Sequence, residues 1–229
     1  MALGMPILSA ILFFLSHHFI LAMPLIILAC GTLGVLLAVW RKQGAWLALL
    51  VFGFLLGMAN VFTGHIANAL FLNAVGVNGT AVITHETETN SMLNDHNIWQ
   101  YDAVLKTADN RDIVTTFDDM SASIYPIRNA ILIPPQAQPF AVKYVPGYPR
   151  NFVILSDQST YGKQRLIQQD LQPVEKAAAQ LAVSPNNPAF IAEYRSALKT
   201  FIATHRNDAD PAIINDCEQK LAALSSTAP

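Results

Sequence analysis

The sequence predicts a membrane α-helical hairpin followed by an α+β extramembrane part, and two observations lead to this fold class. Residues 1–76 contain no Asp or Glu, and their only charged side chains are those of Arg41 and Lys42. All 16 acidic residues lie in the rest of the chain, where the pattern changes from strand to helix near residue 158. We therefore expect a membrane anchor at residues 1–76, a small β domain at 77–157 and a C-terminal helical region at 158–229.

The uncharged run that precedes Arg41 is too long for one straight span. As a continuous helix it would measure roughly 52 Å, against about 30 Å of hydrocarbon in a bilayer. A polar Ser-His-His break at residues 16–18 divides it. We expect one span at residues 19–40, a second at 45–66, and an interfacial or re-entrant helix at 5–15. The sequence leaves open whether residues 5–15 cross the membrane.

The link between the two expected spans predicts the topology. Arg41 and Lys42 are the only basic residues near either span, and short basic loops stay in the cytoplasm. The second span then carries the C-terminal part to the opposite side. In a Gram-negative host this predicts a cell inner membrane protein with a periplasmic domain.

Small residues recur on one face of each expected span. In lipid, such faces allow close backbone approach, and a buried amide adds a hydrogen bond. The simplest interpretation is that the two spans pack on each other as a hairpin. Homo-oligomerisation or docking on another membrane subunit is the alternative. The packing residues are Gly31, Gly34, Gly53, Gly57, Asn60 and Gly64.

The extramembrane part opens with segments of alternating polarity that are typical of strands. They occupy residues 79–90, 97–107, 113–117, 140–145 and 152–155. About five short antiparallel strands of this kind predict a small β-barrel or rolled sheet.

The C-terminal part has helical periodicity. Residues 161–183 form one helix kinked at Pro173, or two short helices. Two further helices open alike, because Asn187 and Asp210 each precede a proline that can occupy the first turn. Each has one apolar stripe, which predicts a helical hairpin or bundle.

No motif for nucleotide binding, serine hydrolysis or zinc proteolysis occurs. His85 and His96, with nearby carboxylates, could bind a divalent metal, but such residues also keep an edge strand soluble. Cys30 lies in an apolar run and Cys217 in a helical pattern, so no disulfide is expected. We expect no catalytic residue, no metal and no cofactor. The acidic balance of residues 77–229 also disfavours nucleic acid as a partner.

Aromatic residues near proline-rich loops and on the C-terminal helices suit contacts with another protein. Packing on the β domain is the competing interpretation for the loop tyrosines. The candidate partner-binding residues are Tyr125, Tyr144, Tyr148, Tyr161, Tyr194, Phe201 and Leu221.

Two short segments resemble those of a broad group of uncharacterised bacterial two-span membrane proteins. That resemblance implies two spans before a small β-rich extramembrane domain, over roughly residues 20–156, and carries over no catalytic residues. The segments are Gly79-Thr80-Ala81-Val82-Ile83 and Phe140-Ala141-Val142-Lys143-Tyr144-Val145-Pro146-Gly147-Tyr148-Pro149.

Taken together, these features favour a non-enzymatic, membrane-anchored protein-interaction module facing the periplasm. It could be an accessory subunit of an envelope complex or a toxin-immunity protein, and the sequence does not separate the two. A subunit of a small oligomeric channel or transporter is the second hypothesis. A metal-dependent enzyme using His85 and His96 is the third.

Overall fold

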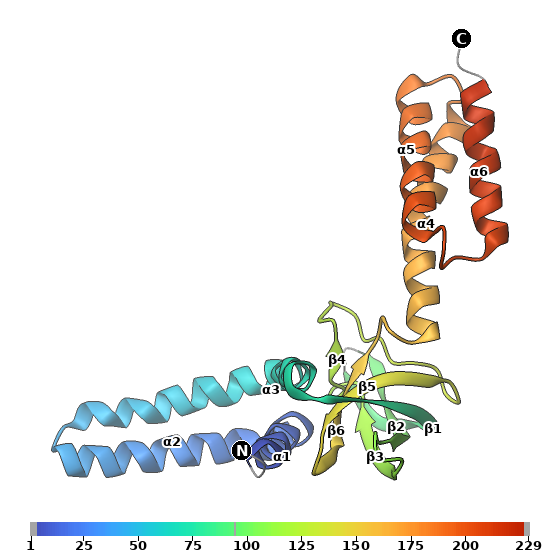
Figure 1. Ribbon diagram of the computed structural model, residues 1–229. Coiled ribbons are helices and arrows are strands. Elements are labelled where there is room, and N and C mark those ends of the chain that lie inside the picture. Colours follow the sequence, from blue (N-terminus) through green and yellow to red (C-terminus); the bar gives the residue numbers. More distant parts are fainter. Residues whose placement is uncertain (1–3, 94, 227–229) are drawn as a thin grey trace. The chain divides into compact units, whose positions relative to one another are not determined.

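The computed structural model describes residues 4–93 and 95–226, and it confirms the predicted order of apolar helices, strands and C-terminal helices. Residues 1–159 form one compact unit and residues 160–229 a second. The elements, labelled in Figure 1, are α1 (Gly4–His17), α2 (Phe19–Arg41), the 3-10 helix η1 (Gly44–Leu47), α3 (Ala48–Val75), β1 (Val77–Leu93), β2 (His96–Lys106), β3 (Asp112–Asp118), β4 (Ile124–Tyr125), β5 (Pro139–Val145), β6 (Tyr148–Leu155), α4 (Thr160–Val183), α5 (Pro188–His205) and α6 (Pro211–Ser226).

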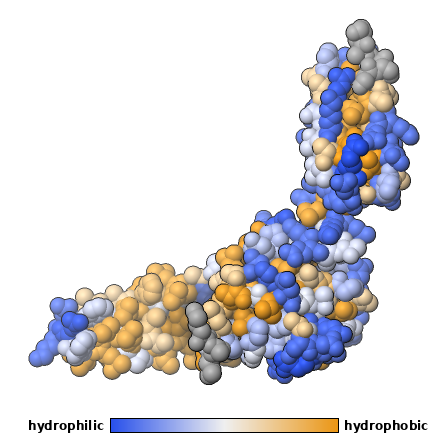
Figure 2. Space-filling view, viewed as in Figure 1, coloured by the Kyte–Doolittle hydropathy of each residue, from blue (hydrophilic) through white to orange (hydrophobic). Residues whose placement is uncertain are grey.

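Helices α2 and α3 lie side by side as an antiparallel hairpin (Figure 1). The stretches Phe19–Arg41 and Gly44–Val75 are each long and apolar enough to cross a membrane. The hairpin turns at Lys42, whose backbone is left-handed with φ 51° and whose N–H donates to Ala38 O. Figure 2 shows the hairpin as a largely hydrophobic column with a hydrophilic tip.

The small residues of α2 and α3 lie where the two backbones approach most closely. A Cβ added at Gly34 would lie 2.7 Å from the backbone oxygen of Trp46, and one at Gly53 would lie 2.6 Å from the Cβ of Cys30. Gly31 and Gly57 likewise face side chains of the opposite helix, Leu50 and Met23. A side chain at Gly34 or Gly53 would push the helices apart, because its Cβ would meet a backbone oxygen or another Cβ.

The last two residues of the α3 stripe face a different helix. Asn60 Nδ2 donates to Leu15 O of α1 at 2.9 Å, and a Cβ on Gly64 would lie 3.4 Å from that same oxygen. Since α2 begins only at Phe19, α1 covers this part of α3. At 14 residues, α1 is roughly 21 Å long, which is short of the hydrocarbon thickness.

A buried polar cluster joins α1, α3 and the sheet. The side-chain amides of Asn68 and Asn151 donate to each other's oxygens, both at 2.8 Å. Asn68 Nδ2 also donates to Ser123 Oγ at 2.8 Å, and Asn151 Nδ2 donates to Ser9 O at 2.9 Å. Both Asn residues are 0% exposed. These hydrogen bonds therefore fix the C-terminal part of helix α3 to the sheet.

The sheet is mixed, with strand order β3-β2-β1-β5-β6-β4. Its neighbours are antiparallel except for β4, which pairs parallel to β6 through Ile124 and Ile154. The ladder ends at β3 and β4, so the closed barrel suggested by the sequence is not shown. The sheet is nonetheless strongly curved. In a flat sheet β3 and β6 would be about 19 Å apart, yet Thr115 Oγ1 on β3 donates to Arg150 O on β6 at 3.1 Å.

One face of this curved sheet holds the main apolar core. Phe117 and Phe152 meet edge to face with ring centroids 5.7 Å apart. The buried members of the core are Ala81, Ile83, Ala103, Leu105, Phe117, Ala122, Phe140, Val142, Tyr144, Phe152 and Ile154.

The C-terminal unit is three helices around a separate core. Helix α4 continues through Pro173 as one element. The predicted caps at the start of α5 and α6 are present: Asn187 Oδ1 accepts from Ala189 N at 3.0 Å, and Asp210 Oδ1 accepts from Ala212 N at 2.8 Å. The core consists of Ile167, Val174, Ala177, Tyr194, Leu198, Phe201, Ile202, Ile214 and Cys217.

The glycine contacts give a direct test of the hairpin. Gly34→Ala and Gly53→Ala should each lower the melting temperature of the detergent-purified protein, because the new methyl group overlaps the opposite helix. Gly44→Ala is the matched control, since nothing lies within 4 Å of its added Cβ. Equal melting temperatures for all three variants would show that α2 and α3 are packed differently.

Candidate functional site

The seven candidate partner-binding residues are divided between the two units. Tyr144, Tyr194 and Phe201 are buried in the two cores and offer little free surface for the expected partner contact, although Phe201 lines a groove between α4 and α5. The Tyr144 hydroxyl accepts from Ala108 N at 2.8 Å. Leu221 is half-buried against the helical core.

The other three tyrosines are half-buried. The ring of Tyr148 packs edge to face on Phe13 of α1, with centroids 5.7 Å apart. Tyr125 belongs to β4 and packs against the small core formed by α3 and β6. Tyr161 is in the first turn of α4. At least Tyr125 and Tyr148 therefore hold the first unit together.

His85 and His96 are too far apart to share a metal ion. In the β1–β2 hairpin His96 pairs with Leu93, whereas His85 pairs with Asp102. Six residues of β2 separate His96 from Asp102, which is roughly 20 Å. Within the described residues, no group of three or more His, Cys, Asp or Glu could hold a metal ion.

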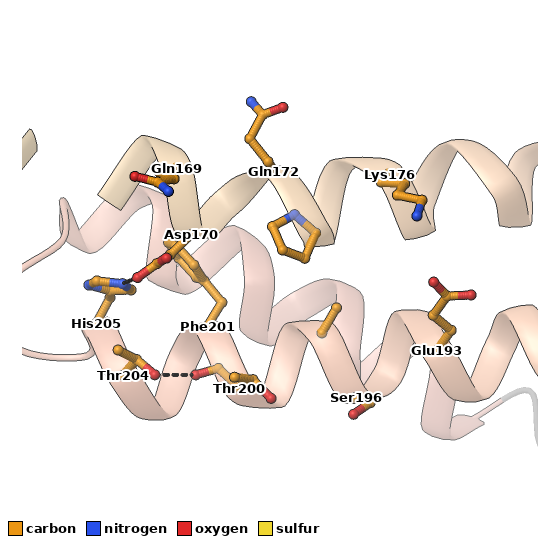
Figure 3. A pocket seen from close by; sticks show the side chains of 12 residues that line it. Gln169, Asp170, Gln172, Lys176, Glu193, Ser196, Thr200, Phe201, Thr204 and His205 are labelled. Carbon is orange, nitrogen blue, oxygen red and sulfur yellow. Dashed lines mark hydrogen bonds and ion pairs between the residues drawn. The ribbon is translucent and has the colours of Figure 1, made fainter. Parts of the chain in front are cut away.

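A groove of about 830 Å³ lies between α4 and α5. Figure 3 shows its polar side chains: Asp170 and Lys176 come from α4, and Glu193 and Thr200 from α5. Phe201 also lines the groove. The groove is lined by Gln169, Asp170, Gln172, Pro173, Lys176, Glu193, Ser196, Ala197, Thr200, Phe201, Thr204 and His205.

His205, at the end of α5, lies at one end of this groove and contacts both α4 and the turn after α5. Its Nε2 lies 2.9 Å from an oxygen of Asp170 on α4 (Figure 3). Its Nδ1 lies 3.1 Å from an oxygen of Asp208, in the turn after α5. The His205 side chain is buried, and its ring packs against Phe201 at 5.1 Å between centroids. Because carboxylates hold both ring nitrogens, His205 acts as a structural clamp.

A second cavity, of about 410 Å³, lies between α4 and α6. Burial raises the pKa of the Tyr194 hydroxyl and of the Cys217 thiol, both of which line it. At the rim, a hydrogen bond from Lys220 to Asp216 raises the pKa of the Lys220 ammonium. A raised thiol pKa keeps Cys217 protonated at neutral pH, so this cavity offers no activated nucleophile.

Hydroxyls, amides and charges of both signs line the α4–α5 groove. The sequence contained one signal for it. Gln169, Gln172 and Lys176 recur at spacings that place them on one face of α4. On α5, the sequence pointed to the apolar stripe and not to the polar residues that line the groove.

The clamp can be tested by substitution. His205→Ala should destabilise the C-terminal unit by roughly 2 kcal/mol, because it leaves a cavity and removes the donor to Asp170. Hydrogen exchange of the α5 amides in the full-length protein would report the change. Thr204→Ala is the control, since that hydroxyl donates only to Thr200 O of its own helix. Equal protection in both variants would show that His205 does not clamp the helices.

No family model matches this sequence, and no curated protein or solved structure matches it either. Its function is therefore inferred from the apolar hairpin and from the groove between α4 and α5.

Proposed function

We propose that this chain is a non-enzymatic, membrane-anchored interaction protein that presents its sheet and its C-terminal helices outside the cytoplasm. The observation that carries the proposal is the surface of the hairpin. In each of the two long apolar stretches, only 11% of the most hydrophobic window is buried. A core helix of a soluble protein would be mostly buried. Exposed apolar area costs about 25 cal/mol per Å² in water, so lipid is the solvent that suits this surface.

The position of the basic residues supports the proposed orientation. Arg41 and Lys42 lie at the hairpin turn, and the sheet begins at Val77, directly after the far end of α3. The guanidinium of Arg41 lies 4.4 Å from the ring centroid of Trp40, an arrangement typical of a membrane interface. A cytoplasmic tip would place β1 and everything after it on the periplasmic side of an inner membrane.

The α4–α5 groove supports a protein partner. A polar, mixed-charge groove on a membrane-anchored chain suits an accessory subunit of an envelope complex and an immunity protein against an incoming toxin alike. The contacts of His205 with Asp170 and Asp208 hold α4 and α5 in place before a partner binds. A pre-formed site loses less conformational entropy on binding.

The channel or transporter hypothesis is weakened by the hairpin contacts. An oligomer axis lined by glycine needs a free glycine face, whereas Gly31, Gly34, Gly53 and Gly57 all face the neighbouring helix of the same chain. The enzyme hypothesis is weakened by the roughly 20 Å of strand between His96 and Asp102, the partner of His85.

Orientation can be measured with reporter fusions. Alkaline phosphatase fused after Pro229 should be active, and a reporter that works only in the cytoplasm should be silent, because the second span exports residues 77–229. Changing Arg41 and Lys42 to Glu should lower the phosphatase signal. An active cytoplasmic reporter on the unmodified chain would overturn the periplasmic assignment.

The groove can be tested by co-purification from a detergent extract, with the partner identified by mass spectrometry. Thr200→Arg places a long cation on the groove wall and should reduce the recovered partner about tenfold, equivalent to roughly 1.4 kcal/mol. Ala203→Arg adds the same side chain to an exposed position of α5 outside the groove. Unchanged recovery with Thr200→Arg would move the binding site elsewhere.

A further inference from the structure

One loop of the sheet unit lies beside α3 where that helix should leave the bilayer. From Gly44 to Ile66 the helical segment rises roughly 33 Å, close to the hydrocarbon thickness of about 30 Å. His65 and Ile66 share a cavity of about 200 Å³ with residues 126–131. The loop lies at the edge of the bilayer only if α3 spans the membrane, so a contact between the loop and lipid rests on the proposed function.

The loop at residues 126–135, here named the isoleucine loop, is fixed at both ends. Before it, β4 pairs with β6. After it, Ala137 N donates to Ile83 O at 2.9 Å, and Gln136 Nε2 donates to Thr84 O at 2.7 Å. The loop is therefore held in place next to α3 by the sheet itself.

The loop presents apolar side chains outward. Ile131 is 62% exposed and Ile127 is 40% exposed, although both line the cavity beside α3. The only charged residue of the loop is Arg128. Its guanidinium makes a paired contact with the carboxylate of Asp157, with Nη2 to Oδ2 at 2.8 Å. A paired charge costs less to bring towards lipid than an unpaired one.

Helix α1 adds a second apolar surface around the same end of α3. Its inner side holds Ser9 and Leu15 against the sheet and α3. Its outer side exposes Ile7, Leu8 and Ile11, and residues 4–17 contain no Asp, Glu, Lys or Arg. The apolar surface of the spans thus continues past Ile66 onto the first unit.

We propose that the isoleucine loop and the outer side of α1 form a collar that sits in the lipid interface on the sheet's side of the bilayer. The isoleucine side chains enter the boundary between headgroups and acyl chains, as interfacial segments do. The backbone of the loop stays in the headgroup layer, where its polar groups are hydrated. The occupant of this surface is the bilayer that holds α2 and α3, because the collar is continuous with them.

The collar is tested with an environment-sensitive fluorophore on single cysteines, in a chain carrying Cys30→Ala and Cys217→Ala. The protein is placed in phosphatidylcholine–phosphatidylglycerol nanodiscs that contain a lipid with a nitroxide near the headgroup. Ile131→Cys and Ile127→Cys report on the loop. Leu55→Cys, an exposed residue within α3, is the lipid control.

Met92→Cys is the water control. Met92 is 62% exposed like Ile131, and roughly 50 Å of extended strand separates it from Val77, where β1 leaves α3. The labels at 127 and 131 should show blue-shifted emission, quenching by the lipid nitroxide and protection from an aqueous quencher. The label at Met92 should show the reverse.

If the labels at 127 and 131 behave like that at Met92 while the one at Leu55 is quenched by lipid, the collar is wrong but the membrane anchor stands. The loop would then be free to contact another protein. If the label at Leu55 also lies in water, both the anchor and the collar are overturned.

Discussion

The mutual hydrogen bonds of Asn68 and Asn151 fix how the apolar hairpin is attached to the sheet. Both side-chain amides are fully buried. Each donates a hydrogen bond to the other. Asn68 also donates to Ser123, and Asn151 also donates to Ser9. An orphaned buried amide costs roughly 1–3 kcal/mol. Turning α3 by one residue would swing Asn68 through about 100° and break its hydrogen bonds to Asn151 and Ser123. The Asn68–Asn151 pair therefore fixes the rotation of α3 about its axis and, with it, the positions of α1 and β6.

The elements that the sequence predicted well are those governed by local physics. Apolar length predicts the two long helices α2 and α3, and the caps at Asn187 and Asp210 depend on neighbouring residues only. The parallel pairing of β4 with β6 and the Asn68–Asn151 contact join segments far apart in the chain, and neither leaves a periodic signal. Closure of the sheet into a barrel was beyond prediction for the same reason, since the number of short strands says nothing of whether the two outer ones pair.

The candidate site was harder to predict than the fold. A tyrosine on a strand or helix looks alike in sequence whether it faces a partner or a core, and Tyr144 and Tyr194 face cores. The groove depends instead on polar residues such as Asp170 and Glu193, from two helices whose facing sides are set only by packing. In sequence, His205 is a residue that suits the end of a helix, whereas its two carboxylate partners become visible only in three dimensions.

The contact between Ser9 and Asn151 spans 142 positions of the chain, and this separation has a consequence for biosynthesis. Helix α1 precedes both helices of the apolar hairpin in the chain, yet the strand that holds its polar side is made long after them. Until β6 arrives, the helix needs a temporary environment, and its uncharged sequence suits the lipid surface. Assembly of the first unit thus ends when the polar side of α1 packs onto a completed sheet.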